Sequence, residues 1–556
     1  MNQTNADMQK IEMAGNVLVL GGGLTGIRTA DAIAAQGYSV SLVESGEAVG
    51  LEAESRPLNG FNKAEMNILY KMVEQIRSSE RIEVLEQTSL ARAAGVAGNY
   101  KIWLSGQAAL VEKNVGAIVV ASELTREPLN QVYGLEIGKA VISQSGLEQT
   151  LASEPRNFAD KTVAFVVGFA QTGNPLVMER VLRSALELAQ VDGSSVYVYV
   201  KDLKVAAEDL ERLYMQTRDR GVLFFKLDHA PDIELNENGV SITYNDPVIS
   251  EDIILQADIL VIEETIEADC ANTRLADILG IDIGKEGFLQ SDNVHRYPVA
   301  TNREGIFVVG GSRQVQTLDQ ALMDAENAAL QVRRLLGDGT ILVPANKAVL
   351  DTGKCTFCLT CFRCCPHGAI YWNTDNKPVI SPVACQGCGI CAGECPMDAI
   401  QIGEFSDTAI HEQLQCSVSD TAGKTPKIVA FCCQNSAMEA AQMARDFRIG
   451  LPGGLRLVQV PCAGKIDLDY ILNAFVEGAD GVLVMACHSG NCKSEHGNTY
   501  AQWRVNDVQQ KLSEAGLDRA RLRYATLASN MASDFVCIVT EFETLLKDLE
   551  ADQALI

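Results

Sequence analysis

Cysteine is the residue type in this chain whose placement most directly suggests chemistry. The chain has 17 cysteines, and only Cys270 falls within the first 354 residues. Nine lie between Cys355 and Cys395, and seven lie between Cys416 and Cys537. Thiols in a reducing compartment bind metal more often than they form disulfides, so this crowding predicts metal centres in the second half of the chain.

Two cysteine runs share the spacing Cys-x2-Cys-x2-Cys-x3-Cys-Pro, which is typical of bacterial two-cluster ferredoxins. In that arrangement the fourth cysteine of each run ligates the cluster held by the other run. Zinc knuckles are the alternative, and two complete runs that each end in Cys-Pro disfavour them. Cys364 adjoins Cys365, and the x3 spacing favours Cys365 as the fourth ligand of its run. We therefore expect two [4Fe-4S] clusters, one on Cys355, Cys358, Cys361 and Cys395, and the other on Cys385, Cys388, Cys391 and Cys365.

A third set of cysteines lies at or just after expected parallel strands near the C-terminus. Side chains at the carboxyl ends of parallel strands meet at one edge of the sheet, so four thiolates could converge there on a [2Fe-2S] cluster. A zinc ion on Cys487, Cys492 and His488 or His496 is one alternative. Unligated buried thiols are the other. The set comprises Cys432 or Cys433, with Cys462, Cys487 and Cys492.

A glycine-rich turn near the N-terminus predicts a dinucleotide site. Residues 16–20 form an apolar run that leads into Gly21, Gly22, Gly23, Leu24, Thr25 and Gly26, followed by a helical pattern and a second apolar run ending in Glu44. This is the order of a dinucleotide-binding βαβ unit, with the acid placed for the ribose. The segment TNREGIFVVGG, which contains Gly310 and Gly311, is typical of flavoproteins with two dinucleotide domains. It favours FAD over NAD.

A second Rossmann-like start lies inside the first domain. The run at 161–167 is followed by Gly168 and Gly173, without a full glycine fingerprint or an evident ribose partner. We expect a retained fold with a degenerate nucleotide site. The fold class is therefore α/β, similar to thioredoxin-reductase-type flavoproteins, with an added α+β ferredoxin module and a C-terminal α/β domain on a parallel sheet. The expected boundaries are 14–158 and 266–340 for the FAD domain, 159–265 for the insert, 341–405 for the ferredoxin, 406–426 for a linker and 427–550 for the last domain.

Composition excludes several other classes. The 556 residues are 47% hydrophobic and 21% charged, which is ordinary globular usage. A net charge of −26 disfavours binding to nucleic acid or to anionic lipid. No apolar run approaches the roughly 18 residues of a membrane span, and the N-terminus lacks a secretory signal. We expect a cytoplasmic chain with no membrane span of its own. It could still be attached to a membrane through a partner protein.

Three segments, residues 21–44, 196–225 and 301–311, together resemble the flavin-bearing A subunit of heterodisulfide reductase. The double cysteine run is similar to the ferredoxin module of that subunit. Residues 427–550, with the motifs FCCQNSAMEAA, VPCAGKID and MACHSGNCKSEHGN, resemble the delta subunit of methyl-viologen-reducing hydrogenase, whose cysteines hold a [2Fe-2S] cluster. The fused order also resembles the B subunit of the quinone-interacting membrane-bound oxidoreductase.

Two departures from these families qualify the resemblance. The A subunits usually carry extra cysteines in the flavin part that bind a further cluster, and Met1 to Asp269 contains none. The delta subunit usually opens with Cys-x-x-Cys, whereas here Cys433 is followed by Ser436. Cys433, Cys462, Cys487 and Cys492 remain as ligands, and Cys432 could substitute for Cys433.

The resemblance implies an electron-transfer subunit of a heterodisulfide-reductase-like complex. Its donor would dock on the C-terminal domain, and partner subunits would dock near the flavin or the ferredoxin module. Flavin-based electron bifurcation, which the family performs, and simple two-to-one electron transfer both stay open. One alternative is a quinone-interacting B-type subunit that feeds a membrane partner. Another is a self-contained NAD(P)H-dependent flavoprotein reductase, which the poor inner fingerprint disfavours. A third is a non-catalytic scaffold that binds partners through its acidic surface.

Overall fold

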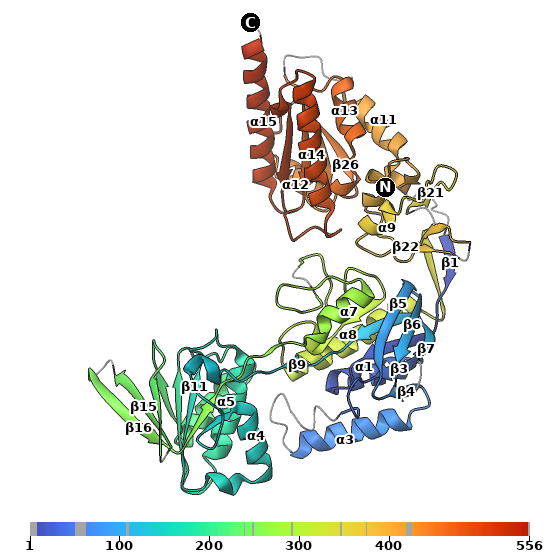
Figure 1. The fold of residues 1–556 in the computed structure, drawn as a ribbon. Helices are drawn as coiled ribbons and strands as arrows, with labels where there is room; N and C mark the ends of the chain where they lie inside the picture. Colours follow the sequence, from blue (N-terminus) through green and yellow to red (C-terminus); the bar gives the residue numbers. More distant parts are fainter. Residues whose placement is uncertain are drawn as a thin grey trace.

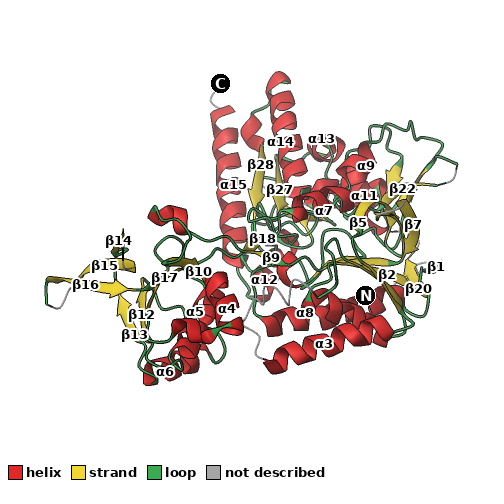
Figure 2. Ribbon diagram, turned by 60° about the horizontal axis from the view of Figure 1, so that its bottom comes forward, coloured by secondary structure: helices red, strands yellow, loops and turns green. Residues whose placement is uncertain are grey.

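The computed structural model describes residues 8–50, 63–106, 110–237, 239–246, 249–290, 293–344, 347–373, 375–418 and 425–553. Figure 1 shows four parts: a central domain (the expected flavin domain), an insert that interrupts it, a small cysteine-rich module and a C-terminal α/β domain. The insert projects from one side of the central domain in both overall views (Figures 1 and 2). No helix among the described residues is both long and apolar enough to cross a membrane.

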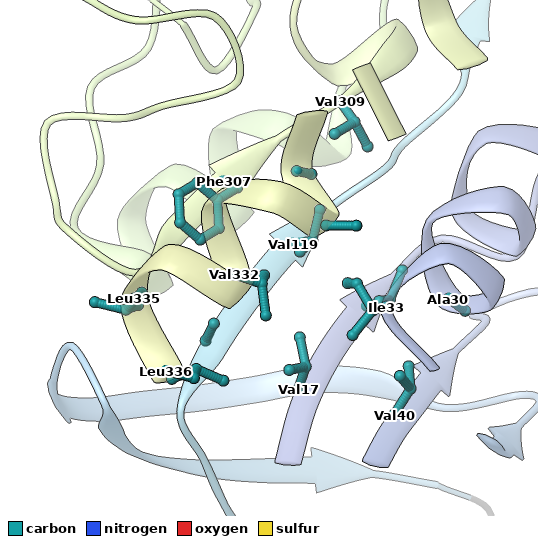
Figure 3. Close-up of a cluster of buried hydrophobic side chains, with 14 of the residues drawn as sticks. Val17, Ala30, Ile33, Val40, Val119, Phe307, Val309, Val332, Leu335 and Leu336 are labelled. Atoms are coloured by element: carbon teal, nitrogen blue, oxygen red, sulfur yellow. The ribbon is translucent and has the colours of Figure 1, made fainter. Parts of the chain in front are cut away.

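The central domain is built on a five-stranded parallel sheet in the order β19-β8-β2-β3-β4. Strands of a parallel sheet are covered on both faces, so their sequences are continuous apolar runs rather than alternating ones. The strand β8, which is buried along its whole length, is an example. Side chains of Val17, Val119, Phe307 and Val332 fill the layer between the sheet and its helices (Figure 3). The strands are β2 (Asn16–Leu20), β3 (Ser39–Val43), β4 (Ile82–Leu85), β8 (Ala117–Val120) and β19 (Ile306–Val308), and the helices are α1 (Leu24–Ala35), α3 (Lys63–Ser78) and α8 (Leu318–Leu336).

An antiparallel sheet in the order β5-β6-β7 completes this domain. Its strands are β5 (Ser89–Val96), β6 (Asn99–Ser105) and β7 (Leu110–Val115). The helix α7 (Ala271–Leu279) packs on β5. The strand β1 (Met8–Glu12) pairs with β20 (Thr340–Pro344), so the start of the described chain is tied to the segment that leads into the cysteine-rich module.

The insert has its own five-stranded parallel sheet, in the order β10-β17-β11-β12-β13, and an antiparallel sheet, β14-β15-β16. Two short strands, β9 (Leu124–Thr125) and β18 (Glu267–Ala268), pair where the chain enters and leaves it. The other elements are β10 (Val141–Ser143), α4 (Gln144–Ser153), β11 (Thr162–Val167), α5 (Pro175–Leu188), β12 (Ser195–Val200), α6 (Leu210–Asp219), β13 (Leu223–Lys226), β14 (Asp232–Asn236), β15 (Gly239–Asp246), β16 (Glu251–Ala257) and β17 (Ile259–Ile262).

The insert begins before the expected residue 159. That boundary leaves the strand β10 and helix α4 in the flavin domain, but β10 pairs with β17 inside the insert. The apolar run at 161–167, which leads into a glycine turn, is recognisable in the sequence as the first strand of a Rossmann unit. An edge strand of three residues that precedes this strand has no such signal, so the expected boundary lies too late in the chain.

The cysteine-rich module repeats one pattern twice, since each cysteine run passes through a short helix. The helix α9 (Thr360–Cys364) lies in the first run and α10 (Ile390–Gly393) in the second, and the two helices contact each other. Two short antiparallel pairs enclose them: β21 (Val349–Leu350) with β24 (Ile400–Gln401), and β22 (Ile370–Trp372) with β23 (Pro378–Ile380).

The C-terminal domain has a four-stranded parallel sheet in the order β26-β25-β27-β28. Helices lie on both faces of this sheet (Figure 1), and the last helix packs against α12. The elements are β25 (Ile428–Cys433), α12 (Ala437–Asp446), β26 (Leu455–Val460), α13 (Leu468–Val476), β27 (Gly481–Ala486), α14 (Gly497–Glu514), β28 (Leu522–Thr526) and α15 (Ala532–Gln553).

The expected linker at 406–426 contains a helix, α11 (Asp407–Val418). Its Ile410 and Leu414 are buried in the core of the C-terminal domain. These two residues are four apart and lie on one face of the helix, which is enough to bury it although the segment is polar overall. The segment is therefore packed structure over 407–418, and residues 419–424 lie outside the described part.

Candidate cofactor sites

The glycine turn opens into a cavity at the carboxyl ends of β2 and β3. Gly21, Gly22, Gly23 and Glu44 line it. Gly21 has φ +110°, and a Cβ on Gly26 would lie 1.9 Å from the Gly21 carbonyl oxygen, so both positions require glycine. The helix α1 begins at Leu24 without a side-chain cap, so its first amides face the turn. An anion is favoured at such a helix N-terminus.

Glu44 is fixed by its own backbone surroundings. Its carboxylate accepts hydrogen bonds from the Gly22 and Gly46 amides, each at 2.5 Å. The side chain is 9% exposed and lines the cavity. A carboxylate oriented in this way can accept hydrogen bonds from the hydroxyls of an adenosine ribose.

The returning segment lies beside the same turn. A Cβ on Gly310 would meet the Thr25 side chain at 2.8 Å, and a Cβ on Gly311 would meet the Ser122 carbonyl oxygen at 2.9 Å. The structure thus brings Gly310 to the start of α1 and Gly311 to the loop that follows β8. These contacts and the turn fit a flavin dinucleotide of the expected type.

One neighbour opposes an anion at this site. The carboxylate of Glu123 lies against Gly23, 1.9 Å from where a Cβ would be placed, and Glu123 also lines the cavity. A pyrophosphate bound at the turn would be repelled by this charge. The fit to FAD therefore requires the Glu123 side chain to turn away from the loop.

The first set of expected cluster ligands surrounds one apolar hollow. Cys355, Cys358, Cys361 and Cys395 all line it, so the fourth cysteine of the second run does reach the first run. The donor set is four thiols without a competing acid or histidine, as a cubane requires. The rim is apolar and open to solvent: it comprises Phe357, Phe362, Trp372 and Met397, with exposures of 48%, 49%, 37% and 44%.

The second set is more deeply placed. Cys385 and Cys391 are buried, and Cys388 packs against the core of the C-terminal domain. Burial raises the pKa of Cys385, Cys388 and Cys391, and the nearby Cys365 thiol adds to the increase in each of them. Cys365 therefore lies near the other three members of the second set, whose assignment to one cluster stays a prediction.

Cys364 and Cys365 differ in environment. Cys365 Sγ accepts the Ala369 amide at 3.5 Å, as Cys395 Sγ accepts the Ala399 amide at 3.4 Å in the other half. Cys364 Sγ instead donates to the Cys361 carbonyl oxygen at 3.6 Å. Burial raises the pKa of Cys364 to about 12. This geometry favours Cys365 over Cys364 as a thiolate ligand.

The third set forms a closed group of four buried thiols. Cys433 Sγ lies 3.8 Å from Cys487 Sγ, and Cys462 Sγ lies 4.0 Å from Cys492 Sγ. Hydrogen bonds from Cys462 and Cys487 hold the pKa of Cys433 well below its usual value. Cys432 points to the other face of the sheet, in the core that packs under α12 and α15. The geometry favours Cys433 over Cys432.

The zinc alternative finds little support in the histidines. His488 Nδ1 lies 3.0 Å from the Thr526 hydroxyl, and its Nε2 lies 3.4 Å from Met531 Sδ, so both ring nitrogens have partners. His496 is the residue that precedes α14.

The second and third cysteine sets meet at a close seam. A Cβ on Gly464 would lie 2.6 Å from the side chain of Ile390, which precedes Cys391. A Cβ on Gly497 would lie 2.2 Å from Cys462 Sγ. Glycine at 464 lets α10 pack closely on the turn after Cys462, and glycine at 497 lets the start of α14 approach Cys462 Sγ.

The flavin domain contacts the same junction. Asn302 Nδ2 donates to the Pro366 carbonyl oxygen at 2.9 Å, and His367 Nδ1 lies 3.2 Å from the Asn302 carbonyl oxygen. Burial lowers the pKa of His367 to about 4, so its ring is neutral and Nδ1 donates this bond. Nearby, Arg296 forms an ion pair with Glu495, three residues after Cys492.

The glycine turn of the insert is already occupied by a carboxylate. The Gly168 amide donates to both oxygens of Glu263, each at 3.0 Å, and Gln171 donates to the same group at 3.2 Å. In a working dinucleotide site this amide would face the phosphates. The expected degeneracy of this nucleotide site therefore has a physical basis.

Sequence reasoning missed several of these groups. Glu123, Glu263 and Arg296 act across long separations, and no local spacing marks them. Their signal is structural only: each lies in a loop beside a turn or cysteine that the sequence does mark.

Comparison with known proteins agrees with this division of the chain. Residues 428–550 match the methyl-viologen-reducing hydrogenase delta subunit, residues 19–75 an NAD(P)-binding Rossmann-like domain, and residues 378–401 a 4Fe-4S binding domain. The A subunit of the ferredoxin:CoB-CoM heterodisulfide reductase of Methanosarcina mazei is 24% identical over 462 residues, which cover 79% of this chain and 58% of that protein. The chain thus spans just over half the length of this relative.

Two further matches cover single parts. The iron-sulfur D subunit of the F420-non-reducing hydrogenase vhu of Methanocaldococcus jannaschii is 37% identical over 124 residues, which cover 22% of this chain and 92% of that protein. The thioredoxin reductase of T. acidophilum superposes with a TM-score of 0.41 at 15% identity, over 57% of this chain and 97% of that chain. The chain therefore joins a part similar to the A subunit of heterodisulfide reductase to a C-terminal domain that belongs to the methyl-viologen-reducing hydrogenase delta subunit family.

Proposed function

We propose that this chain is a FAD- and iron–sulfur-containing electron-transfer subunit of a heterodisulfide-reductase-like oxidoreductase complex. The observation that carries the proposal is the shared junction of three parts. The loop of the second cysteine run contacts the Cys462 turn on one side, and the end of the first run contacts Asn302 of the flavin domain on the other. Electron transfer between centres needs such close packing, and a scaffold that only binds partners does not.

Each centre has a proposed set of residues. We assign FAD to the turn at Gly21–Gly26, to Glu44 and to Gly310–Gly311. The two [4Fe-4S] clusters are assigned to Cys355, Cys358, Cys361 and Cys395, and to Cys385, Cys388, Cys391 and Cys365. A [2Fe-2S] cluster is assigned to Cys433, Cys462, Cys487 and Cys492. Bound FAD supplies exchange between two-electron and one-electron steps, and the clusters carry single electrons.

The exposures of the cysteines suggest where electrons enter or leave. Cys358 is exposed, and the hollow of the first set opens through an apolar rim. The four thiols of the third set are at most 3% exposed. We therefore place a docking site for a redox partner at the first set, in addition to the donor site expected on the C-terminal domain.

Anaerobic reconstitution with iron and sulfide tests the assignment. We expect one FAD, about ten iron atoms and no zinc per chain, from two cubanes and one [2Fe-2S] cluster. About eight iron atoms with one zinc would rule out the third cluster. As a matched control, Cys537→Ser removes an exposed cysteine outside all three sets and should leave the iron content unchanged.

The carboxylate at Gly168 argues against a self-contained NAD(P)H-dependent reductase. Glu263 holds the amide that a pyridine dinucleotide would need, and its charge would repel the phosphates. We expect NADH and NADPH to leave the flavin of the isolated chain oxidised. Rapid bleaching of the flavin by either nucleotide would favour this alternative.

We propose that the partners are the other subunits of a heterodisulfide-reductase-like complex or of a quinone-interacting complex. Native co-purification identifies them: a soluble hydrogenase or heterodisulfide-reducing subunit supports the first complex, and a membrane quinone-interacting subunit supports the second. Recovery of the chain alone, with its centres intact and reduced by NADH, would contradict both.

A further inference from the structure

Lys465 is a buried lysine in the seam between the second and third cysteine sets. Its side chain is 1% exposed, although Lys is almost never fully buried without a partner. Its ammonium donates to Asp407 Oδ1 at 2.7 Å and to the hydroxyl of Tyr470. The hydroxyl of Tyr470 in turn donates to Asp407. Lys465 and Asp407 thus form an ion pair that Tyr470 bridges.

The lysine stem touches the loop of the second set directly. A Cβ on Gly389 would lie 2.8 Å from Lys465 Cβ and 2.9 Å from its Cδ. Gly389 lies between the ligand positions Cys388 and Cys391. Lys465 is also three residues after Cys462, at the end of the turn that packs on α10. One side chain therefore lies between two sets of ligands.

The two members of the ion pair differ in how strongly solvent screens them. Asp407 is 31% exposed, whereas Lys465 is 1% exposed. Water weakens the field of the carboxylate more than that of the buried ammonium. At the seam, the positive charge of Lys465 should therefore dominate over the negative charge of Asp407.

We propose that Lys465 is a positioning residue that holds the loop of the second [4Fe-4S] cluster against that of the [2Fe-2S] cluster, and that its buried charge raises the reduction potentials of both. The inference rests on the proposed function, because it concerns the ligands assigned there. Removal of a nearby positive charge disfavours adding an electron, and removal of a nearby negative charge favours it.

Redox titrations of the full-length reconstituted protein, followed by EPR, test this inference. In Lys465→Met, we expect the midpoint potentials of the second [4Fe-4S] cluster and the [2Fe-2S] cluster to shift negative. In Asp407→Asn, we expect the same two potentials to shift positive by a smaller amount. Lys465→Arg keeps the charge and should lie closer to the wild type. The first [4Fe-4S] cluster is the internal reference and should not shift.

Opposite signs separate a charge effect from a packing defect, because disturbed packing has no reason to act in opposite directions in the two variants. Shifts of the same sign in Lys465→Met and Asp407→Asn, or no shift in either, would overturn the inference. If Lys465→Met fails to fold, Asp407→Asn and Lys465→Arg test the inference instead. The absence of a positive shift in Asp407→Asn would then overturn it. Lys511→Met, which removes an exposed lysine paired with Asp507, should move no potential.

A different result would contradict the proposed function itself. If the reconstituted wild type shows no cluster signals, the ligand assignment itself is wrong, and the inference falls with it. If all three signals are present and only the shifts are missing, the proposed function stands and Lys465 is merely structural.

Discussion

The side-chain amide of Asn293 donates a buried hydrogen bond to the carbonyl oxygen of Cys492, with a length of 2.9 Å. The two residues are 199 positions apart, one in the returning part of the flavin domain and the other in the third cysteine set. The loop that carries a proposed ligand of the last cluster is therefore supported by a different domain.

Asn293→Ala should loosen this loop. The Cys492 carbonyl would lose a buried partner, which costs about 1–3 kcal/mol. We expect faster loss of the [2Fe-2S] signal to a chelator and a lower Tm. Val294→Ala is the control, because this neighbouring side chain is 77% exposed. Equal chelator rates in the two variants would show that Asn293 gives the loop no support.

Cys364→Ser and Cys365→Ser should differ sharply. The sulfur of Cys364 is directed to the Cys361 carbonyl oxygen, so its replacement should leave the iron content near about ten atoms per chain. Replacement of Cys365 removes a proposed ligand and should lower the content by about four atoms, with loss of one [4Fe-4S] signal. Loss of a cubane from Cys364→Ser would reverse this assignment.

Glu123→Gln should strengthen FAD binding. The substitution keeps the size of the side chain and removes the charge that faces the glycine turn. We expect about a tenfold lower Kd for FAD, which corresponds to about 1.4 kcal/mol, measured by titration of the deflavinated protein. Glu127→Gln, at an exposed position nearby, should leave the Kd unchanged. Weaker binding by Glu123→Gln would mean that Glu123 itself contacts the dinucleotide.

Glu263→Gln should alter how stability depends on pH. Burial raises the pKa of Glu263 above that of the unfolded chain. The stability contributed by this group is fully present below its unfolded pKa of about 4.3, and it is lost as pH rises through the raised value. Glutamine cannot ionise, so the Tm of the variant minus that of the wild type should become more positive as pH rises from about 4.3 through the raised pKa of Glu263.

An exposed carboxylate provides the control for this experiment. Glu237 lies on the surface of the insert, and Glu237→Gln should show no such trend. A difference in Tm for Glu263→Gln that stays constant across the range would contradict the assigned effect of burial.

Most of the fold could be predicted because its strands are apolar runs bounded by glycines. The turn at Gly21 and the cysteine spacings are local signals, so they also located the proposed flavin and cluster sites. The helix α15 (Ala532–Gln553) and the edge strand β10 were missed because they follow or precede the strands that carry fingerprints. The helix α11 was missed because only Ile410 and Leu414 mark its buried face.

The rest of the site could not be predicted, because it depends on contacts between distant segments. Gly168 and Glu263 are 95 residues apart, and Asp407 and Lys465 are 58 apart. Each pair consists of ordinary residue types without a distinctive spacing. Only the packed structure shows that a carboxylate closes the inner turn and that a lysine lies between two cysteine sets.

The three cysteine sets differ in exposure, and this difference predicts the order in which their clusters are lost to oxygen or chelators. Oxygen and chelators reach the open hollow at Cys358 directly, whereas Cys462 and Cys492 are buried beside the start of α14 and the flavin-domain loop. On exposure to air, the centre at the rim should decay first and the innermost centre last. A preparation could therefore keep its flavin and innermost centre and yet have lost its connection to an outside partner.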